Sequence, residues 1–484
     1  MLLTAGRGAH PSILIAGLSA GFLFGVFSAA YIDWRLFLSL GWLLLAVVLV
    51  GLTFWKRVFY MLPVIILAGI LFGLWRGGLV QQELSVYTNL IGHKVSLGGV
   101  VAEDADKNQR NQTLLRLKNV SIEGHEMAGQ IWVAIDETSD IRRSDMISVT
   151  GKVSKGFGAF AAAIYSPTLG KVERPVPGDV ALHVRDWFGD AVRKVVPAPQ
   201  ADLGLGFLLG QRRGLPPELM QALQIAGLTH VIVASGYNLT ILVRFARRAF
   251  EKVSKYLAAL SSGLMITGFI AITGLSPSMN RAGLVAGLSL LAWYYGRRFH
   301  PVALLLYVAA MTVLIQPSFV WGDLGWLLSF AAFAGVMIVA PLLQAYFFGS
   351  KKPGTIRQIM GETVTAQLVT MPIIIMAFGQ ASLVSVMANM LILPLVPLAM
   401  LLTFLTGLSA VILPGLATLL ALPTTWLLSY MISVADYLAG LSWAQVEVGL
   451  SVWFVGVIYL AIAALCLYLS RATGYRLRES SIVE

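Results

Sequence analysis

The sequence predicts a polytopic α-helical membrane protein with about 11–12 transmembrane helices and an inserted extracytoplasmic β-barrel that is small and OB-like. Apolar and aromatic residues make up 57% of its 484 residues and charged residues only 12%. A typical soluble domain is roughly one quarter charged. Apolar stretches of about 20 residues, long enough to cross ~30 Å of hydrocarbon, recur through most of the chain. This composition excludes a water-soluble globular enzyme.

The formal net charge of +11 is unevenly distributed along the chain. Residues 81–200 contain 14 Lys or Arg and 14 Asp or Glu, so that segment is neutral and the excess of 21 basic over 10 acidic residues lies elsewhere. Short basic loops between membrane helices face the cytoplasm under the positive-inside rule. The charge therefore describes topology more than a nucleic-acid-binding surface.

Residues 1–80 form an N-terminal membrane segment of three helices. Its apolar runs lie at residues 11–31, 36–55 and 58–80. Lys56 and Arg57 separate the second run from the third, which places that loop in the cytoplasm. Three crossings then deliver the next segment to the outer side.

Residues 81–180 change character and alternate apolar with polar residues, as in HKVSLGGVVAE, QTLLRLKN and MISVTGKVS. A period of two with one apolar face predicts a small antiparallel β-barrel or sandwich. A five-stranded OB-like barrel fits this length, and a generic β-domain without a ligand fits equally well. This is the extracytoplasmic domain.

Residues 181–205 are predicted as an amphipathic helix with a linker. The string ALHVRDWFGDAVRKV places Leu182, Trp187 and Val192 on one side of a helix and charged residues on the other. Such a helix lies in a membrane interface or packs on the β-domain, and the sequence leaves both open. Pro197 ends it.

Residues 206–484 form the main membrane domain. Its apolar runs lie near residues 222–243, 257–275, 282–296, 302–318, 322–345, 363–379, 384–408, 411–436 and 450–470. Basic clusters separate them at Arg244, Arg247, Arg248, Lys252 and Lys255, at Arg297 and Arg298, at Lys351, Lys352 and Arg357, and at Arg471, Arg476 and Arg478. If each run crosses once, these clusters and both termini face the cytoplasm. The 222–243 run is polar enough for a re-entrant or broken helix.

Polar groups at membrane depth are costly unless they face protein or water, so they mark candidate functional sites. His230, Ser235 and Asn238 occur within one apolar run, GLTHVIVASGYNL. A Ser-Gly break there predicts a cavity lining, with interhelical packing as the alternative. Gln367 and Asn389 extend this polar seam beyond kinking prolines.

Arg281 and Asp323 form a second polar feature. Arg281 lies one turn into a helix that Pro277 begins, and Asp323 stands at the outer start of its own span. The predicted topology puts both at one membrane depth, so they are candidates for a structural ion pair. The alternative is that Arg281 snorkels to the outer interface.

The sequence predicts no enzyme, no cofactor and no metal site. Its six histidines are scattered without an HxH or HExxH pair, and Cys466 is the single cysteine. No phosphate-binding loop of the Walker type occurs. The protein is therefore not expected to hydrolyse a fuel itself.

The string GFLLGQRRGLPPELMQALQIAGLTHVIVASGYNL resembles the signature of the ComEC family, the competence channel for DNA uptake. Three further blocks are similar in order: SPSMNRAG, PSFVWGDLGWLLSFAAFAG and TAQLVTMPIIIMAFGQASLVSVMANMLILPLVP. The blocks span residues 206–397, and the N-terminal spans with an outer β-domain also look like that family's arrangement.

The resemblance implies an inner-membrane channel that passes single-stranded DNA into the cytoplasm. A path for DNA needs cationic and stacking groups. The candidates for lining it are His230, Ser235, Asn238, Arg281, Gln367 and Asn389, with Arg212 and Arg213 at the outer mouth and Tyr237 and Trp326 as stacking groups. An extracytoplasmic DNA receptor and a cytoplasmic ATPase or helicase are the implied partners.

Two departures from the family pattern matter. Asn238 stands where many members have a second histidine, so it can donate a hydrogen bond but does not titrate. Many members continue into a metallo-β-lactamase-like domain, and this sequence lacks its HxHxDH motif. A separate nuclease would then degrade the other strand. The competing interpretations are a secondary transporter of a small or lipid-linked solute and a membrane scaffold.

Overall fold

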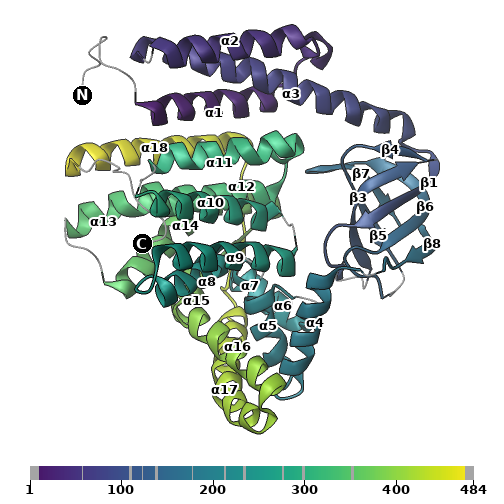
Figure 1. Cartoon of the computed structure of the whole chain (residues 1–484), viewed down its shortest axis with the longest axis vertical. Helices are drawn as coiled ribbons and strands as arrows, with labels where there is room; N and C mark the ends of the chain where they lie inside the picture. The colour runs from purple at the N-terminus through teal and green to yellow at the C-terminus, as the bar shows by residue number, and fades with distance from the viewer. Residues whose placement is uncertain are drawn as a thin grey trace. The chain divides into compact units, whose positions relative to one another are not determined.

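The computed structural model describes residues 10–56, 58–107, 112–122, 124–136, 140–176, 178–211, 214–232, 236–274, 277–296, 300–349 and 354–474. The chain forms two compact units (Figure 1). The first comprises Met1–Gly178 and Phe299–Leu327, and the second comprises Asp179–Arg298 and Leu328–Glu484.

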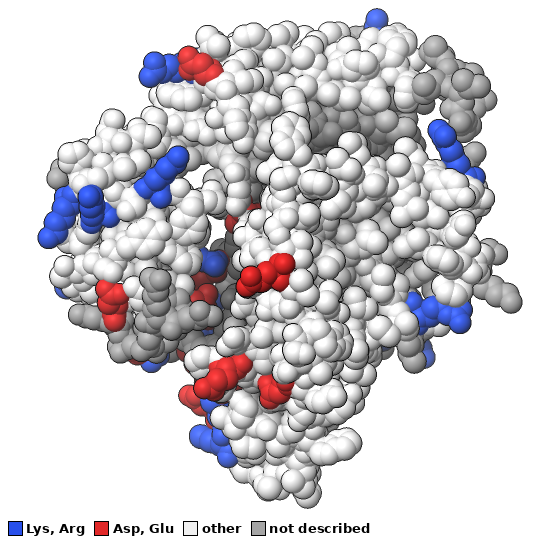
Figure 2. Space-filling model, turned by 180° about the vertical axis from the view of Figure 1, so that it is seen from behind, with Lys and Arg blue, Asp and Glu red and all other residues white. Residues whose placement is uncertain are grey.

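Eight described helical segments are long and apolar enough to cross a bilayer. They are Pro11–Ser28, Phe59–Leu90, Lys255–Thr273, Leu324–Phe348, Arg357–Phe378, Ser385–Ile412, Pro414–Ala439 and Val452–Thr473. Shorter apolar helices occur at Leu40–Lys56, Gln200–Leu209 and Pro301–Ile315. Figure 2 shows one face of the molecule that is mostly uncharged, with charged side chains in separate groups. The predicted polytopic helical fold is confirmed.

The first unit begins with three helices that lie side by side (Figure 1). Its helical elements are α1 (Pro11–Ser28), η1 (Trp34–Phe37), α2 (Leu40–Lys56), η2 (Phe59–Met61), α3 (Leu62–Leu90), α11 (Pro301–Ile315) and η3 (Pro317–Trp321). Glycines at a spacing of four run along the contact between α1 and α3. They are Gly17, Gly21 and Gly25 on α1 and Gly69, Gly73 and Gly77 on α3.

These glycines allow the two backbones to touch. A Cβ atom at Gly21 would overlap the carbonyl oxygen of Ile66, and one at Gly73 would overlap that of Phe22. In a bilayer such close approach replaces the hydrophobic effect as the source of helix association, because lipid tails are as apolar as the side chains. The α1–α3 pair is therefore the tightest helix contact of this unit.

Helix α3 joins the membrane part of the first unit to the β-domain. Its 29 residues extend about 43 Å at 1.5 Å per residue, well beyond ~30 Å of hydrocarbon. The C-terminal turns carry Leu84, Tyr87 and Leu90 into the apolar core of the β-domain. The helix thus supplies both a membrane span and one cap of the β-domain core.

The β-domain is a closed five-stranded barrel with the strand order β1-β3-β5-β7-β6, in which β6 pairs back onto β1. The barrel strands are β1 (Lys94–Val101), β3 (Thr113–Ile122), β5 (Gln130–Ile135), β6 (Met146–Lys155) and β7 (Phe160–Tyr165), with β2 (Asp106–Lys107), β4 (His125–Met127) and β8 (Thr168–Glu173) at their sides. Alternation on β3 buries Leu115 and Leu117 and turns Arg116 outward. The OB-like barrel is confirmed, but β5 and β7 run parallel, whereas the alternation alone predicted antiparallel pairing.

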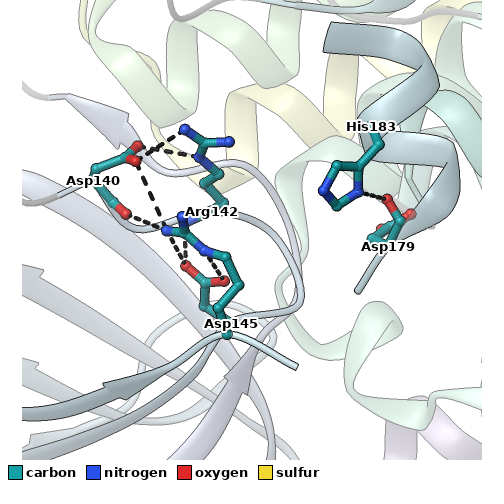
Figure 3. A network of polar contacts seen from close by, with 6 residues as sticks. Asp140, Arg142, Asp145, Asp179 and His183 are labelled. Carbon is teal, nitrogen blue, oxygen red and sulfur yellow. Dashed lines mark hydrogen bonds and ion pairs between the residues drawn. The ribbon is translucent and has the colours of Figure 1, made fainter. Parts of the chain in front are cut away.

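A carboxylate network secures the barrel where the chain leaves it (Figure 3). Arg174, just after β8, donates from Nε and Nη2 to the two carboxylate oxygens of Asp145, at 3.1 and 3.2 Å. Asp145 is only 2% exposed and also accepts from the Arg142 backbone at 2.8 Å. The hydrogen bond to Asp145 raises the pKa of Arg174 above its usual value. The ion pair between Arg174 and Asp145 therefore fixes the chain where it leaves the barrel.

Replacing Asp145 by alanine is expected to loosen β6 and β8. The change leaves the Arg142 amide without its acceptor and removes two hydrogen bonds of the Arg174 guanidinium, which still donates to the Asp140 carbonyl. The expected cost is about 2 kcal/mol. Hydrogen exchange of the β6 amides should then be about 30-fold faster. The Asp140→Ala variant is the matched control, because Asp140 joins the same network but its side chain is 65% exposed. Equal exchange in both variants would contradict this role.

The second unit is helical. Its elements are α4 (Val180–Arg193), α5 (Gln200–Leu209), α6 (Pro217–Ile225), α7 (Thr229–Ile232), α8 (Gly236–Phe250), α9 (Lys255–Thr273), α10 (Pro277–Tyr294), the π-helical turn Gly335–Val339, α13 (Ala340–Phe348), α14 (Thr355–Phe378), α15 (Ser385–Ile392), η5 (Leu393–Leu395), α16 (Val396–Ile412), α17 (Pro414–Ala439) and α18 (Val452–Thr473). Helix α12 (Leu324–Ala334) begins in the first unit and ends in the second. Strands β9 (Gln380–Ser382) and β10 (Gln445–Glu447) form a short antiparallel pair.

The amphipathic helix predicted after the β-domain is α4. It begins at Asp179, whose carboxylate accepts from the Leu182 amide at 3.0 Å. Within the second unit it packs on α16, where the Phe188 ring stacks on Phe404 with centroids 6.1 Å apart. Trp187 remains 58% exposed. One face of α4 therefore packs on α16, and the Trp187 ring is exposed on another face.

Candidate functional site

The motif Gly-Leu-Thr-His begins at the end of α6 with a helix-terminating turn. Gly227 has a φ of +71°, and its amide donates to the Gln224 carbonyl at 3.0 Å while the Leu228 amide donates to the Leu223 carbonyl at 2.8 Å. These two bonds define a Schellman motif, which requires a left-handed residue that glycine adopts without strain. The turn fixes where α7 starts and therefore where His230 lies.

Gly227 also lies against α15. A Cβ atom at this position would stand 2.5 Å from the Cβ of Ser385, and Ser382, just before α15, donates through its hydroxyl to the Ile225 carbonyl at 2.5 Å. The turn is thus held from outside as well as by its own backbone. Helix α15, which carries Asn389, is positioned by the same contacts.

Replacing Gly227 by alanine is expected to destabilise the second unit. The left-handed backbone costs about 1 kcal/mol, and the overlap with Ser385 adds roughly 1–3 kcal/mol. Gly379→Ala is the matched control, because Gly379 has a φ of +68° at the end of α14 with open space around its Cβ position. Thermal unfolding of the purified protein should show a clearly larger loss for Gly227→Ala. Equal losses would remove the contact with Ser385 from the explanation.

Asn238 lies in the first turn of α8 and is fully buried. Its Nδ2 donates to the Phe207 carbonyl of α5 at 3.0 Å and to the Val231 carbonyl of α7 at 3.3 Å. Both carbonyls belong to helix ends, where backbone acceptors lack partners within the helix. The amide therefore joins three helices, which is the interhelical role that the sequence left open for this residue.

His230 lies on α7, with its ring hydrogen-bonded to the backbone of Gly227, and part of its surface is accessible. Gln367 is half-buried on α14. Neither side chain belongs to the apolar core cluster of this unit. Ser235, Arg212 and Arg213, the other predicted members of the set, lie outside the described residues.

Asn389 on α15 is 2% exposed, and its Oδ1 meets no hydrogen-bond donor among the described residues. A buried acceptor without a donor costs about 1–3 kcal/mol, and such groups in proteins are usually met by water or a ligand. Ala388, beside Asn389, shares one core cluster with Phe207 and Val231, the acceptors of Asn238. The structure therefore brings Asn238 and Asn389 to the same helical core.

Arg281 is buried in the second unit, one turn into α10, with 3% of its surface exposed. Its guanidinium carbon lies 5.7 Å from the centre of the Phe330 ring. The next residue, Ala282, stands against Gly236, where a Cβ atom would lie 3.2 Å from the Ala282 Cβ. Burial rules out the snorkelling alternative, and Arg281 adjoins the start of α8.

Asp323 and Trp326 stabilise the start of α12 in the first unit. Asp323 accepts from the Trp326 amide at 2.5 Å, and the Trp326 indole donates to the Thr312 hydroxyl at 2.9 Å. Trp326 is 7% exposed, so its ring is packed rather than offered for stacking. Arg281 and Asp323 belong to different units, and their ion pair stays a prediction.

Tyr237 lies next to Asn238 on α8 and is 39% exposed. Its hydroxyl donates to the Leu393 carbonyl at 3.4 Å, and the charges of Arg244 and Glu362 lie within electrostatic reach of it. Helix α8 thus presents Tyr237 and Arg244 two turns apart, toward the acidic residue of α14.

The sequence did not predict a polar network around Gln211. Arg193 of α4 donates to the Asp202 carboxylate of α5 at 2.9 Å and to the Gln211 amide oxygen at 2.9 Å. Gln211 in turn donates to Asp186 at 3.0 Å, and Asp186 also accepts from Arg185 at 3.1 Å. Gln211 is the hub, because an amide can accept and donate at once. Spacing along the chain gave no signal of these partners.

Replacing Arg193 by methionine is expected to destabilise the second unit by about 3 kcal/mol, because it leaves the buried Asp202 carboxylate without its partner. Adding Asp202→Asn to that variant should restore part of the loss, since the uncompensated charge is then gone. Asp190→Ala is the control, because Asp190 is 70% exposed and 3.5 Å from Arg193. Thermal unfolding of the single and double variants tests this, and a double variant less stable than Arg193→Met would contradict it.

Two further observations limit the chemistry. Among the described residues, no group of three or more His, Cys, Asp or Glu side chains is placed to hold a metal ion. A pocket of about 360 Å³ in the first unit is lined by both signs of charge, Arg76 and Lys118 with Glu83 and Glu126. Such a lining does not select for a polyanion. The cationic and amide groups described above belong to the second unit.

Comparison with known proteins assigns the chain to a family through a match that covers most of the second unit and part of the first. A family model described as "Competence protein" matches residues 207–472, more than half of the chain. The ComE operon protein 3 of Bacillus subtilis (strain 168) is 23% identical over 215 residues, which are 44% of this chain and 27% of that protein. The match thus covers about a quarter of the relative's length. No solved structure matches the chain. With its apolar helices and its family match, this multi-pass membrane protein belongs to the competence protein family.

Proposed function

We propose that the protein is a channel of the inner membrane that translocates single-stranded DNA into the cytoplasm during natural transformation. The observation that carries this proposal is a buried arginine within the family-matched residues. Arg281 is 3% exposed among apolar helices and adjoins α8, which also carries Asn238. A buried cation in a membrane domain is costly and marks a functional path.

The chemistry of the cargo fits this set of residues. Single-stranded DNA carries one negative charge per nucleotide and binds in grooves that combine cations with stacking groups. Arg281 supplies a cation, His230 a planar ring, and the half-buried Gln367 an amide that can hydrogen-bond to a base. The acceptor of Asn389 that lacks a described donor is suited to water or to a base amino group. Both termini and the basic loops would face the cytoplasm.

Three protein partners belong to this proposal. A receptor outside the membrane would deliver a strand to the β-barrel, and an ATPase or helicase in the cytoplasm would pull it inward. A separate nuclease would degrade the other strand. The lipid bilayer is the remaining partner, because exposed apolar side chains cover the helices.

The test is a transformation assay on a deletion strain with complementation. Deletion should abolish transformation, and labelled DNA should remain outside the inner membrane. Complementation with the wild-type gene should restore both transformation and entry of labelled DNA into the cytoplasm. A deletion strain that transforms normally would contradict the proposal, and altered uptake of a small solute in that strain would favour a secondary transporter instead.

A further inference from the structure

A basic turn connects α8 to α9 and carries an unusual concentration of positive charge. Residues 244–255 contain five Lys or Arg residues and one Glu. Lys255 is the first residue of α9, which is itself a candidate membrane span. The turn therefore lies at the boundary between hydrocarbon and headgroups when α9 crosses the bilayer.

Aromatic rings hold two of these cations in place. The guanidinium carbon of Arg247 lies 5.3 Å from the centre of the Trp293 ring, and Nζ of Lys255 lies 5.7 Å from the same ring. Nζ of Lys255 is also 5.6 Å from the Tyr294 ring. Arg247 is buried and its Nε also lies 3.9 Å from a carboxylate oxygen of Glu251. Lys255 is exposed, and cation–π contacts orient its charge without neutralising it. Trp293, at the end of α10, thus fixes a pair of cations from two other helices.

Large apolar side chains stand exposed between these charges. Phe245 is 62% exposed, Val253 72%, Tyr256 62% and Tyr295 71%. Aromatic residues with Lys and Arg at a helix end are typical of a membrane interface, where rings sit at headgroup level and aliphatic groups enter the acyl region. A nucleic acid strand offers no apolar phase for Val253 or Phe245. The pattern favours lipid over a soluble polyanion.

We propose that the basic turn is a binding site for an anionic phospholipid, with the exposed Lys255 contacting the headgroup phosphate, the buried Arg247 adding positive charge behind it, and Phe245 and Val253 lying among the acyl chains. The net charge of the turn is complementary to such a headgroup, and each Lys or Arg near an anionic membrane surface contributes substantially to binding. This inference does not depend on the cargo of the channel. It predicts that the composition of the inner leaflet sets the stability of the α8–α10 bundle.

The test uses the full-length protein in lipid nanodiscs. Phosphatidylglycerol is titrated into phosphatidylcholine discs while the unfolding temperature is followed. Wild-type protein should gain stability in a saturable way, and Lys255→Gln should need about fivefold more phosphatidylglycerol for the same gain. The Arg247→Gln, Lys255→Gln double variant should lose the response. Arg471→Gln, which removes a charge from the last turn of α18, should respond as wild type does.

Three results would overturn the proposal. Lys255→Gln could titrate like wild type, or Arg471→Gln could be weakened as much as Lys255→Gln, which would reduce the effect to general surface charge. A single-stranded oligonucleotide in phosphatidylcholine discs could stabilise the protein through Lys255 while phosphatidylglycerol does not. That last result would assign the basic turn to nucleic acid. Lys255 is exposed, so its variant keeps the test valid if the variant of the buried Arg247 fails to fold.

Discussion

Replacing Arg281 by methionine is expected to lower transformation by on the order of 100-fold, because a charge-assisted contact to a phosphate is worth up to about 3 kcal/mol. Methionine fills a similar volume beside Phe330, so the helices should still pack. Transformation frequency, together with the amount of protein in the membrane fraction, measures the effect.

Two further variants separate charge from packing. Arg281→Lys keeps the positive charge and should retain more transformation than Arg281→Met. Arg471→Met removes an exposed charge at the end of α18 and should be without effect. Wild-type transformation in Arg281→Met would take this residue off the DNA path. Loss of both Arg281 variants from the membrane, with Arg471→Met retained there, would make its role structural.

Replacing Gly73 by alanine should separate α1 from α3. The added Cβ meets the Phe22 carbonyl oxygen, which belongs to backbone and has no rotamer to move into. Overpacking typically costs about 1–3 kcal/mol, and a rigid backbone contact stands at the upper end of that range. Gly73→Leu should therefore leave little folded protein in the membrane.

Gly51→Ala provides the matched comparison, because Gly51 lies in α2 with nothing within 4 Å of its Cβ position. Alanine there should be neutral or slightly stabilising, since it favours the helix. The unfolding temperature in detergent and the yield from membranes give the readout. If Gly73→Ala matched Gly51→Ala in both, the close contact of α1 with α3 would not contribute to stability.

Much of the fold could be predicted from the sequence because it follows from local periodicity. Alternation in the β-domain predicted its strands, and long apolar runs predicted the spans. The parallel pairing of β5 with β7 was not predictable, since alternation reports which face is buried and not which strand is the neighbour. The spacing of Gly21, Gly25, Gly69 and Gly73 indicates close helix packing. Composition alone does not reveal this spacing.

The candidate site was predicted less completely. Arg281 and Asn238 stood out as polar residues in apolar runs, and both are buried. Their partners were not predictable, because Asn238 bonds backbone carbonyls 7 and 31 residues away and the hub at Gln211 joins α4 to α5 through side chains alone. Such contacts depend on tertiary packing, which a single sequence does not encode in its spacing.

The central claim is that polar groups of the second unit contact DNA in transit. Single cysteines placed at Gln367 and Asn389, in a Cys466→Ser background, test it by disulfide trapping with thiol-modified single-stranded DNA during uptake. Leu460→Cys, at a position 72% exposed on α18, reports contact with lipid alone. The proposal predicts crosslinks at Gln367 and Asn389 and none at Leu460. Crosslinking at Leu460 equal to that at the other two, or at none of the three while uptake proceeds, would contradict it.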